Sequence, residues 1–273
     1  MYKVGRDEKG REEKQIAAFG RSTMLSRQKD WQEQDITKHR TRKERIDFLT
    51  ERALRFFDCY SEELESISQV LKIRLGRLAS AYTAENKLPR EAVEVHSRIK
   101  SLRSFLRKLE KANWPVFHFP TEVIMDLIGA RVICWFVHDC YGMLDYIHAT
   151  KQFRIKPRSL EDYIKDPKRT GYRAIHLLAD VAYDSVKTYR NRRTVVEDTM
   201  ICEIQIRTKL QDAWAEFTHE VHSKVPANFQ ADYETAIADI ATRLAAEDRS
   251  VLAVREILQR QSSKKELEDF KND

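Results

Sequence analysis

A short stretch near residue 205 alternates apolar and polar side chains, and this alternation restricts the fold more than any other feature of the chain. The stretch reads Cys-Glu-Ile-Gln-Ile-Arg over residues 202–207. In a β-strand the cysteine and the isoleucines point to one face, while Glu203, Gln205 and Arg207 point to the other, about 7 Å apart. The strand therefore needs a sheet with one covered apolar face and one face that carries a polar row.

The polar row has two interpretations. Buried ionisable groups are costly unless they are paired or used, so the row is interpreted as the floor of a site that handles phosphate and metal. The alternative is an amphipathic strand whose outer face is solvated.

Composition limits the class of protein. The chain has 273 residues, of which 42% are hydrophobic and 34% charged, with a net charge of +6. No run approaches the roughly 18 apolar residues of a membrane span, and the first residues lack the apolar core of a secretory signal, so we expect a cytoplasmic protein without a membrane partner. The four cysteines form no C-x-x-C pair, which gives no support to a zinc ribbon or a redox motif.

The order of the predicted elements is helices, a mixed α/β core and then helices. Strands are expected at 130–137, 153–155, 174–183 and 200–207, and helices at 46–78, 90–111, 138–149, from 209 onward and at 233–261. We therefore predict an α+β fold in which a mixed β-sheet is flanked by N- and C-terminal helices. The predicted divisions are a charged arm (1–44), a core domain with its N-terminal helices (45–228) and a helical extension (229–273).

Two polar segments carry basic residues that could contact RNA. One is the arm at 1–44, and the other is a loop or hairpin tip at 185–199, which contains Lys187, Arg190, Arg192 and Arg193. A solvated surface is the alternative for both.

Two further stretches place polar residues beside expected turns. Residues 126–131 read Asp-Leu-Ile-Gly-Ala-Arg, and a bend at Gly129 would let Asp126 and Arg131 flank one cleft. Residues 162–176 form a basic loop in which Tyr172 follows Gly171. Cations suit phosphate and a flat ring suits a base, so this loop is interpreted as a nucleotide contact, with an ordinary surface loop as the alternative.

Together with residues 98–108, which read R-I-K-S-L-R-S-F-L-R-K, these stretches resemble the synthetase domain of RelA/SpoT-type enzymes, which make the alarmones (p)ppGpp. The resemblance covers about residues 95–224 and implies a nucleotidyltransferase-like core in a small, single-domain member. It implies an ATP-dependent pyrophosphokinase that transfers the β,γ-pyrophosphate of ATP to the ribose 3′-hydroxyl of GDP or GTP and releases AMP.

The resemblance also implies a role for each motif residue. Asp126 and Glu203 would hold Mg²⁺, and Glu203 would assist deprotonation of the attacking hydroxyl. Arg98 and Arg131 would sandwich the adenine of ATP. The residues that would hold the ATP phosphates are Lys100, Ser104 and Lys108. The residues on the acceptor side would be Lys168, Tyr172 (stacked on the base), His176, Gln205 and Arg207.

The acceptor stays open at this point. Glu161 stands where long family members carry a Lys, which removes one cation that could meet the acceptor's 5′ phosphates. Toxic small relatives pyrophosphorylate the 3′ CCA end of tRNA or make (p)ppApp, and this is the alternative function, with tRNA and an antitoxin protein as partners. A catalytically inactive nucleotide-sensing or RNA-binding module is disfavoured because Asp126 and Glu203 are both present.

The last prediction concerns assembly. The apolar stripe from Phe57 to Leu78 packs either on the domain or on another subunit, and together with the C-terminal helices it predicts a homo-oligomer.

Overall fold

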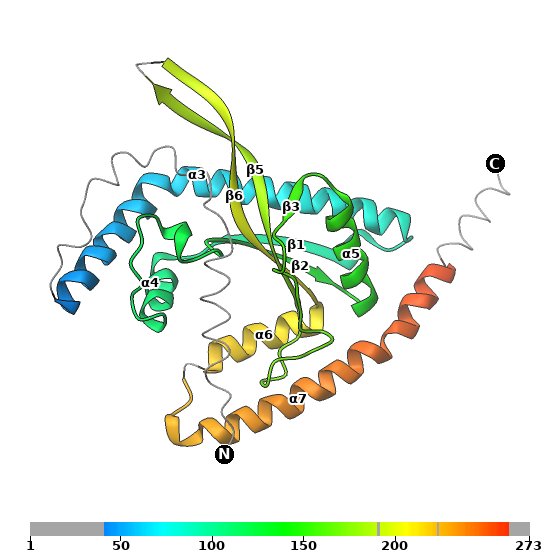
Figure 1. The fold of residues 1–273 in the computed structure, drawn as a ribbon. Coiled ribbons are helices and arrows are strands. Elements are labelled where there is room, and N and C mark those ends of the chain that lie inside the picture. The colour runs from blue at the N-terminus through cyan, green and yellow to red at the C-terminus, as the bar shows by residue number, and fades with distance from the viewer. Residues whose placement is uncertain (1–40, 190–191, 223, 262–273) are drawn as a thin grey trace.

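The computed structural model describes residues 41–189, 192–222 and 224–261, which form one mixed sheet flanked by helices (Figure 1). The predicted α+β class is confirmed. The helices are α3 (Arg42–Glu85), α4 (Leu102–Lys111), α5 (Val137–Ala149), α6 (Lys209–His222) and α7 (Gln230–Ser250), with short 3-10 turns η3 (Arg90–Ala92), η4 (Pro120–Glu122) and η5 (Ala227–Phe229). The strands are β1 (Val93–Ile99), β2 (Ile128–Cys134), β3 (Phe153–Ile155), β4 (Glu161–Asp162), β5 (Ile175–Tyr189) and β6 (Arg192–Thr208).

The long helix α3 begins at a capping box and runs across the sheet. Thr41 accepts a hydrogen bond from the backbone N–H of Glu44 at its side chain, while its own N–H donates to the Glu44 carboxylate. The helix buries one stripe at a spacing of three and four residues, which includes Leu49, Ala53, Phe56, Tyr60, Leu64, Ile67, Leu71 and Leu75. Because this stripe packs into the chain's own core, the structure realises the first of the two expected packings.

The sheet has the order β1-β2-β6-β5-β3, with β4 paired to β5, and β2 and β6 are its parallel pair. The alternation predicted at 202–207 is confirmed, since Cys202, Ile204 and Ile206 are fully buried. They lie in one apolar core with the stripe of α3 and with Met143 and Ile147 of α5. The opposite face of the sheet is free to carry polar side chains.

The single helix predicted at 90–111 is wrong. Val93 and Val95 alternate with polar residues as far as Ile99, which is the two-residue period of a strand, and these residues form β1, antiparallel to β2. The helix α4 then begins behind Ser101, whose side chain accepts a hydrogen bond from the N–H of Ser104. Arg98 therefore lies on a strand, and Lys100 lies between the strand and the helix.

The segment at 185–199, predicted as a loop or hairpin tip, is the outer part of a hairpin of two antiparallel strands. The ladder of β5 and β6 continues to Tyr189 opposite Arg192, so that the two strands project as a long hairpin past α3 (Figure 1). Its base is tied to α3, because Tyr183 and Ser185 each donate a hydrogen bond of 3.0 Å to the Glu63 carboxylate.

The last predicted helix is divided near residue 251, where α7 ends and a further helix covers residues 252–261. This terminal helix is anchored by a buried ion pair in which Arg255 Nε donates to Asp139 Oδ1 at 2.8 Å, and the hydroxyl of Tyr82 donates to the same oxygen at 2.7 Å. In the part of the chain that the structure describes, no helix is long and apolar enough to span a membrane.

The predicted domain divisions remain a prediction. Most of the arm at 1–44 lies outside the described residues, and its last three residues belong to α3.

Candidate active site

Four strands place polar side chains on one face of the sheet. Cross-strand partners set the arrangement: Arg98 is opposite Gly129, Gly129 is opposite Glu203, and Gln205 lies between Arg131 and His176. Residues that are paired in register point to the same face, so motifs far apart in the sequence meet here.

The Glu203 carboxylate is the centre of a hydrogen-bonded chain. Gln205 Nε2 donates to its Oε2 at 2.7 Å, and His176 Nδ1 lies 3.2 Å from its Oε1. The other imidazole nitrogen of His176 is 2.8 Å from the hydroxyl of Tyr172. A glutamate of β6 and a histidine and a tyrosine of the stretch 162–176 therefore form one connected unit.

The surroundings of Glu203 keep it ionised. Burial on its own raises the pKa of this carboxyl group, but the hydrogen bonds from His176 and Gln205 and the charge of Lys108 lower its pKa to about 2. A carboxylate with this pKa is a good anionic ligand and a weak base.

Asp126 lies directly before β2 and is neutralised by two lysines. Lys100 Nζ is 2.8 Å from one carboxylate oxygen, and Lys108 Nζ is 3.2 Å from the other. Since the charge of Lys108 also acts on Glu203, this ammonium group connects the two predicted metal ligands. Ser104 lies one turn before Lys108 on α4, exposed, and accepts a hydrogen bond from Ser101.

A cleft of about 570 Å³ lies between β1, β2 and the first turns of α6. Its lining residues are Glu94, His96, Ser97, Arg98, Arg131, Ile133, Lys209, Asp212 and Glu216. Both arginines that were predicted to sandwich adenine thus border the same cavity. The cleft does not include Asp126 or Glu203. Both lie past the end of the cleft that Arg98 lines, where Arg98 pairs with Gly129.

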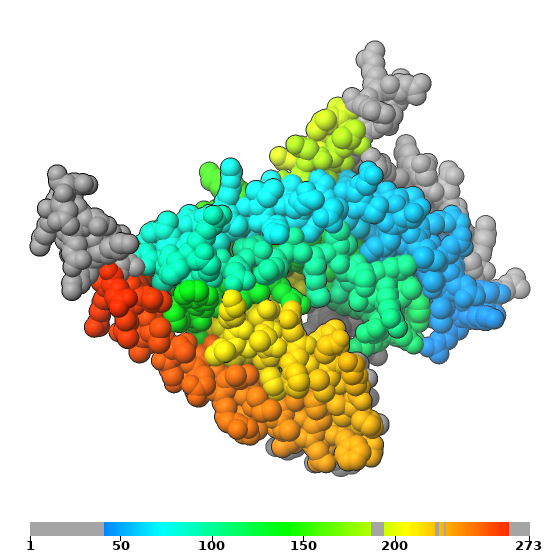
Figure 2. All heavy atoms as spheres, turned by 180° about the vertical axis from the view of Figure 1, so that it is seen from behind, coloured from blue at the N-terminus to red at the C-terminus, as the bar shows by residue number. Residues whose placement is uncertain are grey.

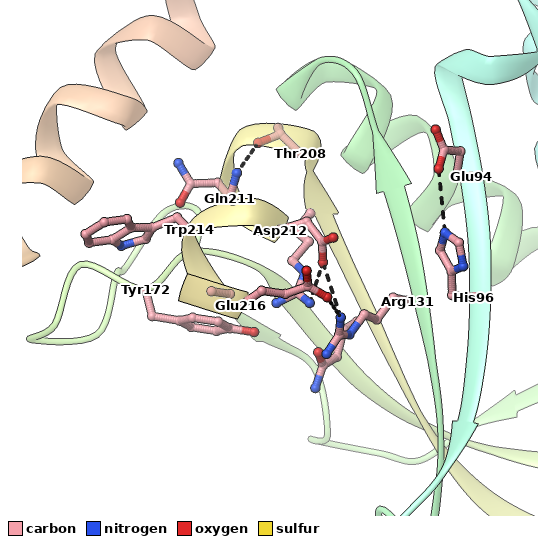
Figure 3. A network of polar contacts seen from close by, with 12 residues as sticks. Glu94, His96, Arg131, Tyr172, Thr208, Gln211, Asp212, Trp214 and Glu216 are labelled. Atoms are coloured by element: carbon pink, nitrogen blue, oxygen red, sulfur yellow. Dashed lines mark hydrogen bonds and ion pairs between the residues drawn. The ribbon is translucent and has the colours of Figure 1, made fainter. Parts of the chain in front are cut away.

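Acidic side chains of α6 hold the arginines of this face (Figure 3). Glu216 Oε1 accepts a hydrogen bond of 2.7 Å from Arg131, and Asp212 lies 3.7 Å from the same guanidinium. Asp212 is also 2.5 Å from Arg207, whose side chain is 3% exposed. Arg207 is therefore buried and paired with Asp212, which suits a residue that holds neighbouring side chains in place.

The loop before β5 brings the remaining acceptor residues to the edge of this face. Lys168 Nζ lies 4.4 Å from the ring of Tyr163 and 5.8 Å from the ring of Tyr172, within the range of a cation–π contact. Burial raises the pKa of the Tyr172 hydroxyl, an effect that the Arg207 guanidinium opposes. Tyr172 points toward the network of Asp212 and Glu216 in Figure 3.

Asp126 and Glu203 are the two carboxylates predicted to hold a metal at this face. Within the described residues no group of three or more His, Cys, Asp or Glu side chains is arranged to hold a metal ion. Mg²⁺ at nucleotide sites is commonly bound by one or two carboxylates together with phosphate oxygens and water. Asp126 and Glu203 are therefore enough protein ligands for this ion, and a cage made only of protein side chains is not needed.

The predicted site residues lie on or beside one face, and the structure adds others to them. The cleft residues that the motifs did not indicate are Glu94, His96, Ser97, Ile133, Lys209, Asp212 and Glu216. Glu94 accepts a hydrogen bond of 2.8 Å from Lys209, which links β1 to α6. Glu94 and His96 alternate with Arg98, and this alternation could have indicated these two residues once the segment is interpreted as a strand.

Comparisons with known proteins agree with this geometry. Residues 97–228 match the region found in RelA/SpoT proteins. The chain is 33% identical over 130 residues to the GTP pyrophosphokinase YwaC of Bacillus subtilis, which covers 47% of this chain and 57% of that protein. It is 29% identical over 175 residues to the GTP pyrophosphokinase YjbM of the same organism, over 64% of this chain and 74% of that protein.

Solved structures give the same result for the fold. The small alarmone synthetase 1 from Bacillus subtilis, bound to its product pppGpp, matches with a TM-score of 0.60 and 25% identity over 75% of this chain and 97% of that chain. A GTP pyrophosphokinase family protein from Streptococcus pneumoniae matches with a TM-score of 0.59 and 26% identity, over 75% of this chain and 95% of that chain.

Proposed function

We propose that this chain is a small alarmone synthetase of the RelA/SpoT family, because residues 97–228 match the region found in RelA/SpoT proteins. It transfers the β,γ-pyrophosphate of ATP to the ribose 3′-hydroxyl of GDP or GTP. The observation that carries the proposal is the position of Glu203, which is hydrogen-bonded toward Tyr172 on one side and lies near the lysine pair of Asp126 on the other. In this position Glu203 would lie between ATP, the pyrophosphate donor, and the guanosine nucleotide that accepts it.

On the donor side, the adenine enters the cleft between Arg98 and Arg131, and Glu216 holds the second arginine in place. Lys100 and Lys108 exchange their contacts with Asp126 for the ATP phosphates. Mg²⁺ held by Asp126 and Glu203 would neutralise charge on the transferred group, and the transfer then depends mainly on positioning.

On the acceptor side, Tyr172 offers its ring to the base and Gln205 fixes the orientation of Glu203. Since the pKa of Glu203 is about 2, it accepts a proton poorly, and its main contribution would be to hold Mg²⁺ and to orient the acceptor hydroxyl. A nucleotide acceptor is supported by the relative that was solved with pppGpp bound.

One of the alternative acceptors, a tRNA 3′ end, is favoured by one feature of the acceptor loop. Glu161 Oε2 accepts a hydrogen bond of 2.6 Å from Tyr163, so a carboxylate occupies the edge of the loop where the 5′ phosphates of GDP would approach. A tRNA end bears no such 5′ diphosphate, and its binding would weaken steeply with salt.

The test is a transfer assay with purified protein, Mg²⁺ and ATP labelled on the γ-phosphate. GDP, GTP, ATP alone and deacylated tRNA are offered as separate acceptors, and the products are separated by chromatography. We expect label on a guanosine nucleotide. Label on tRNA or on an adenosine nucleotide would replace the acceptor with the alternative, and no labelled acceptor in any arm would contradict pyrophosphate transfer itself.

Gly129 leaves a gap on the site face, and we predict that filling the gap blocks transfer. A Cβ at Gly129 would meet one neighbouring atom, the backbone oxygen of Glu203 at 3.8 Å, so the fold has room for a side chain there. The Gly129→Val protein should melt no lower than wild type, because valine suits a strand better than glycine. Its transfer rate should fall by about a hundredfold, because the new side chain lies between Arg98 and Glu203.

The control for Gly129→Val is Ala130→Val, one residue along and 2% exposed on the opposite, apolar face. This change overpacks the core and should lower the melting temperature. A Gly129→Val enzyme with wild-type turnover would mean that no substrate passes over Gly129.

A further inference from the structure

The helix α7 lies against the loop that carries Tyr172. Figure 1 shows this loop below the sheet, between α6 and α7, and Figure 2 shows α6 and α7 lying together on the other side of the molecule. The two helices share a buried apolar cluster in which Trp214 of α6 packs with Ile237 and Ala241 of α7.

Gly171 of this loop lies against Ala241 of α7. Its backbone has φ +77°, a left-handed conformation, and any Cβ added there would collide with the Cβ of Ala241. Glycine is thus required at this position for two reasons, its conformation and the approach of α7. The N–H of Gly171 donates to the carbonyl of Lys168 at 2.7 Å and closes the turn that precedes Tyr172. Because Gly171 belongs to this turn, the turn itself lies against the helix.

An ion pair holds the loop to α7 two residues before Gly171, and the charge of Arg173 acts on Asp248 of the same helix. Arg169 forms an ion pair of 2.8 Å with Glu234. Burial raises the pKa of the Asp248 carboxyl, hydrogen bonds from Gln211 and Thr208 oppose this, and the nearby charge of Arg173 opposes it further. The loop is therefore held to one helix at Arg169 and at Gly171, whose partners Glu234 and Ala241 lie two turns apart.

The same helix also reaches the end of β6. Asp248 Oδ2 accepts hydrogen bonds of 3.0 Å from Thr208 and 2.8 Å from Gln211, and these three side chains are buried. The strand β6 ends at Thr208, so α7 contacts both the strand that bears Glu203 and the loop that bears Tyr172.

We propose that α7 is a positioning element for the acceptor, which holds the loop of residues 163–173 so that Tyr172 meets the acceptor beside His176 and Glu203. Displacing the loop from α7 breaks the chain of hydrogen bonds that runs from Tyr172 through His176 to Glu203. The kinetic test of this proposal rests on the proposed function, whereas the test by amide hydrogen exchange does not.

The test is Ala241→Leu, which adds bulk where Gly171 approaches, compared with Ala246→Leu on the exposed side of the same helix. For Ala241→Leu we expect the KM for the acceptor to rise by about tenfold or more, with the KM for ATP within about twofold of wild type. In the control both KM values should stay at the wild-type level.

Amide hydrogen exchange measures the loop without any assay of activity. The amides of Lys168 and Gly171 donate within the loop, so they should exchange faster in Ala241→Leu than in Ala246→Leu. Unchanged exchange in the loop, or an equal rise of both KM values, would overturn the proposal. If the loop amides exchange faster in Ala241→Leu but the wild-type protein transfers no label, the contact of α7 with the loop is supported and the proposed function is contradicted.

A second pair of variants covers the case in which Ala241→Leu fails to fold. Glu234→Arg sets two like charges against each other at the exposed pair with Arg169, and Arg169→Glu in the same chain restores the pair in reverse. The single variant should raise the acceptor KM by about threefold and the double variant should recover it, because an exposed pair contributes up to about 1 kcal/mol. Asp239→Arg, opposite Arg243 on the same helix, is the matched control. Equal kinetics for Glu234→Arg and Asp239→Arg would contradict the proposal.

Discussion

The Glu203→Gln protein is expected to bind ATP and acceptor with near wild-type affinity and to lose turnover by about a thousandfold or more. The amide is the same size as the carboxylate and keeps one oxygen to accept the hydrogen bond from Gln205. It lacks the negative charge that a metal requires and that His176 now faces at 3.2 Å. The change therefore removes charge from the centre of the site and leaves its packing in place.

Binding and turnover should be measured separately, by calorimetry with a non-hydrolysable ATP analogue and by single-turnover transfer. The matched control is Glu220→Gln on α6, where an exposed glutamate pairs with Lys224 and the same loss of one charge should change neither quantity. Wild-type turnover in Glu203→Gln would remove this residue from the catalytic assignment.

The pH dependence of stability follows from the same group. The pKa of Glu203 falls from its usual value of 4.5 to about 2 in the folded protein, so its carboxylate stabilises the fold in full above about pH 4.5. That contribution decreases as the pH falls and is lost as the pH passes through 2. In Glu203→Gln this part of the acid sensitivity should be absent, which a comparison of melting temperatures between pH 3 and pH 6 would measure.

The second large effect is expected from the buried ion pair that anchors the terminal helix. Asp139 is fully buried and Arg255 has a side chain 8% exposed, so Arg255→Met leaves a carboxylate in the core with Tyr82 as its remaining hydrogen-bond donor among the contacts described here. An uncompensated buried charge costs about 3–5 kcal/mol, and we expect a loss of that size in the free energy of unfolding. Chemical denaturation followed by circular dichroism would measure it.

Two comparisons separate this loss from the loss of packing. Arg260→Met lies in the same terminal helix, where the arginine forms an exposed pair with Glu256, and it should change stability by less than about 0.5 kcal/mol. Asp139→Leu added to Arg255→Met removes both charges and should recover much of the lost stability. If Arg255→Met and Arg260→Met melt alike, the pair does not anchor the helix.

Much of the fold could be predicted from local pattern, because its long elements are strongly periodic. The stripe of α3 repeats over many turns, and the strand at 202–207 alternates without interruption. The segment at 90–111 failed because a short strand and a short helix are joined there, and their apolar residues together imitate one helical face. The segment at 185–199 was predicted as a loop or hairpin tip without its strand ladder, because its polar residues hide a ladder that pairing between the strands stabilises.

The candidate site could be predicted where it coincides with motifs and not where it depends on register. Asp126, Arg131 and Glu203 stand in recognisable stretches, but the pairing of Glu203 with Gly129 and of Arg131 with Gln205 is a property of the sheet. Glu94 reaches the cleft because β1 runs antiparallel to β2, which the helical interpretation of that segment concealed. The contact of Gly171 with Ala241 joins residues 70 positions apart, and no local pattern reports it.

The parallel pairing of β2 with β6 also determines when the site can exist during synthesis of the chain. Parallel strands need a long connection, and here everything from α5 to the β5–β6 hairpin must be made before Arg131 and Gln205 become neighbours. The helix that seats the acceptor loop follows later still. A chain that has emerged only as far as α6 thus carries every motif residue without its final support, so transfer activity should begin only once the last helices have been made and have docked.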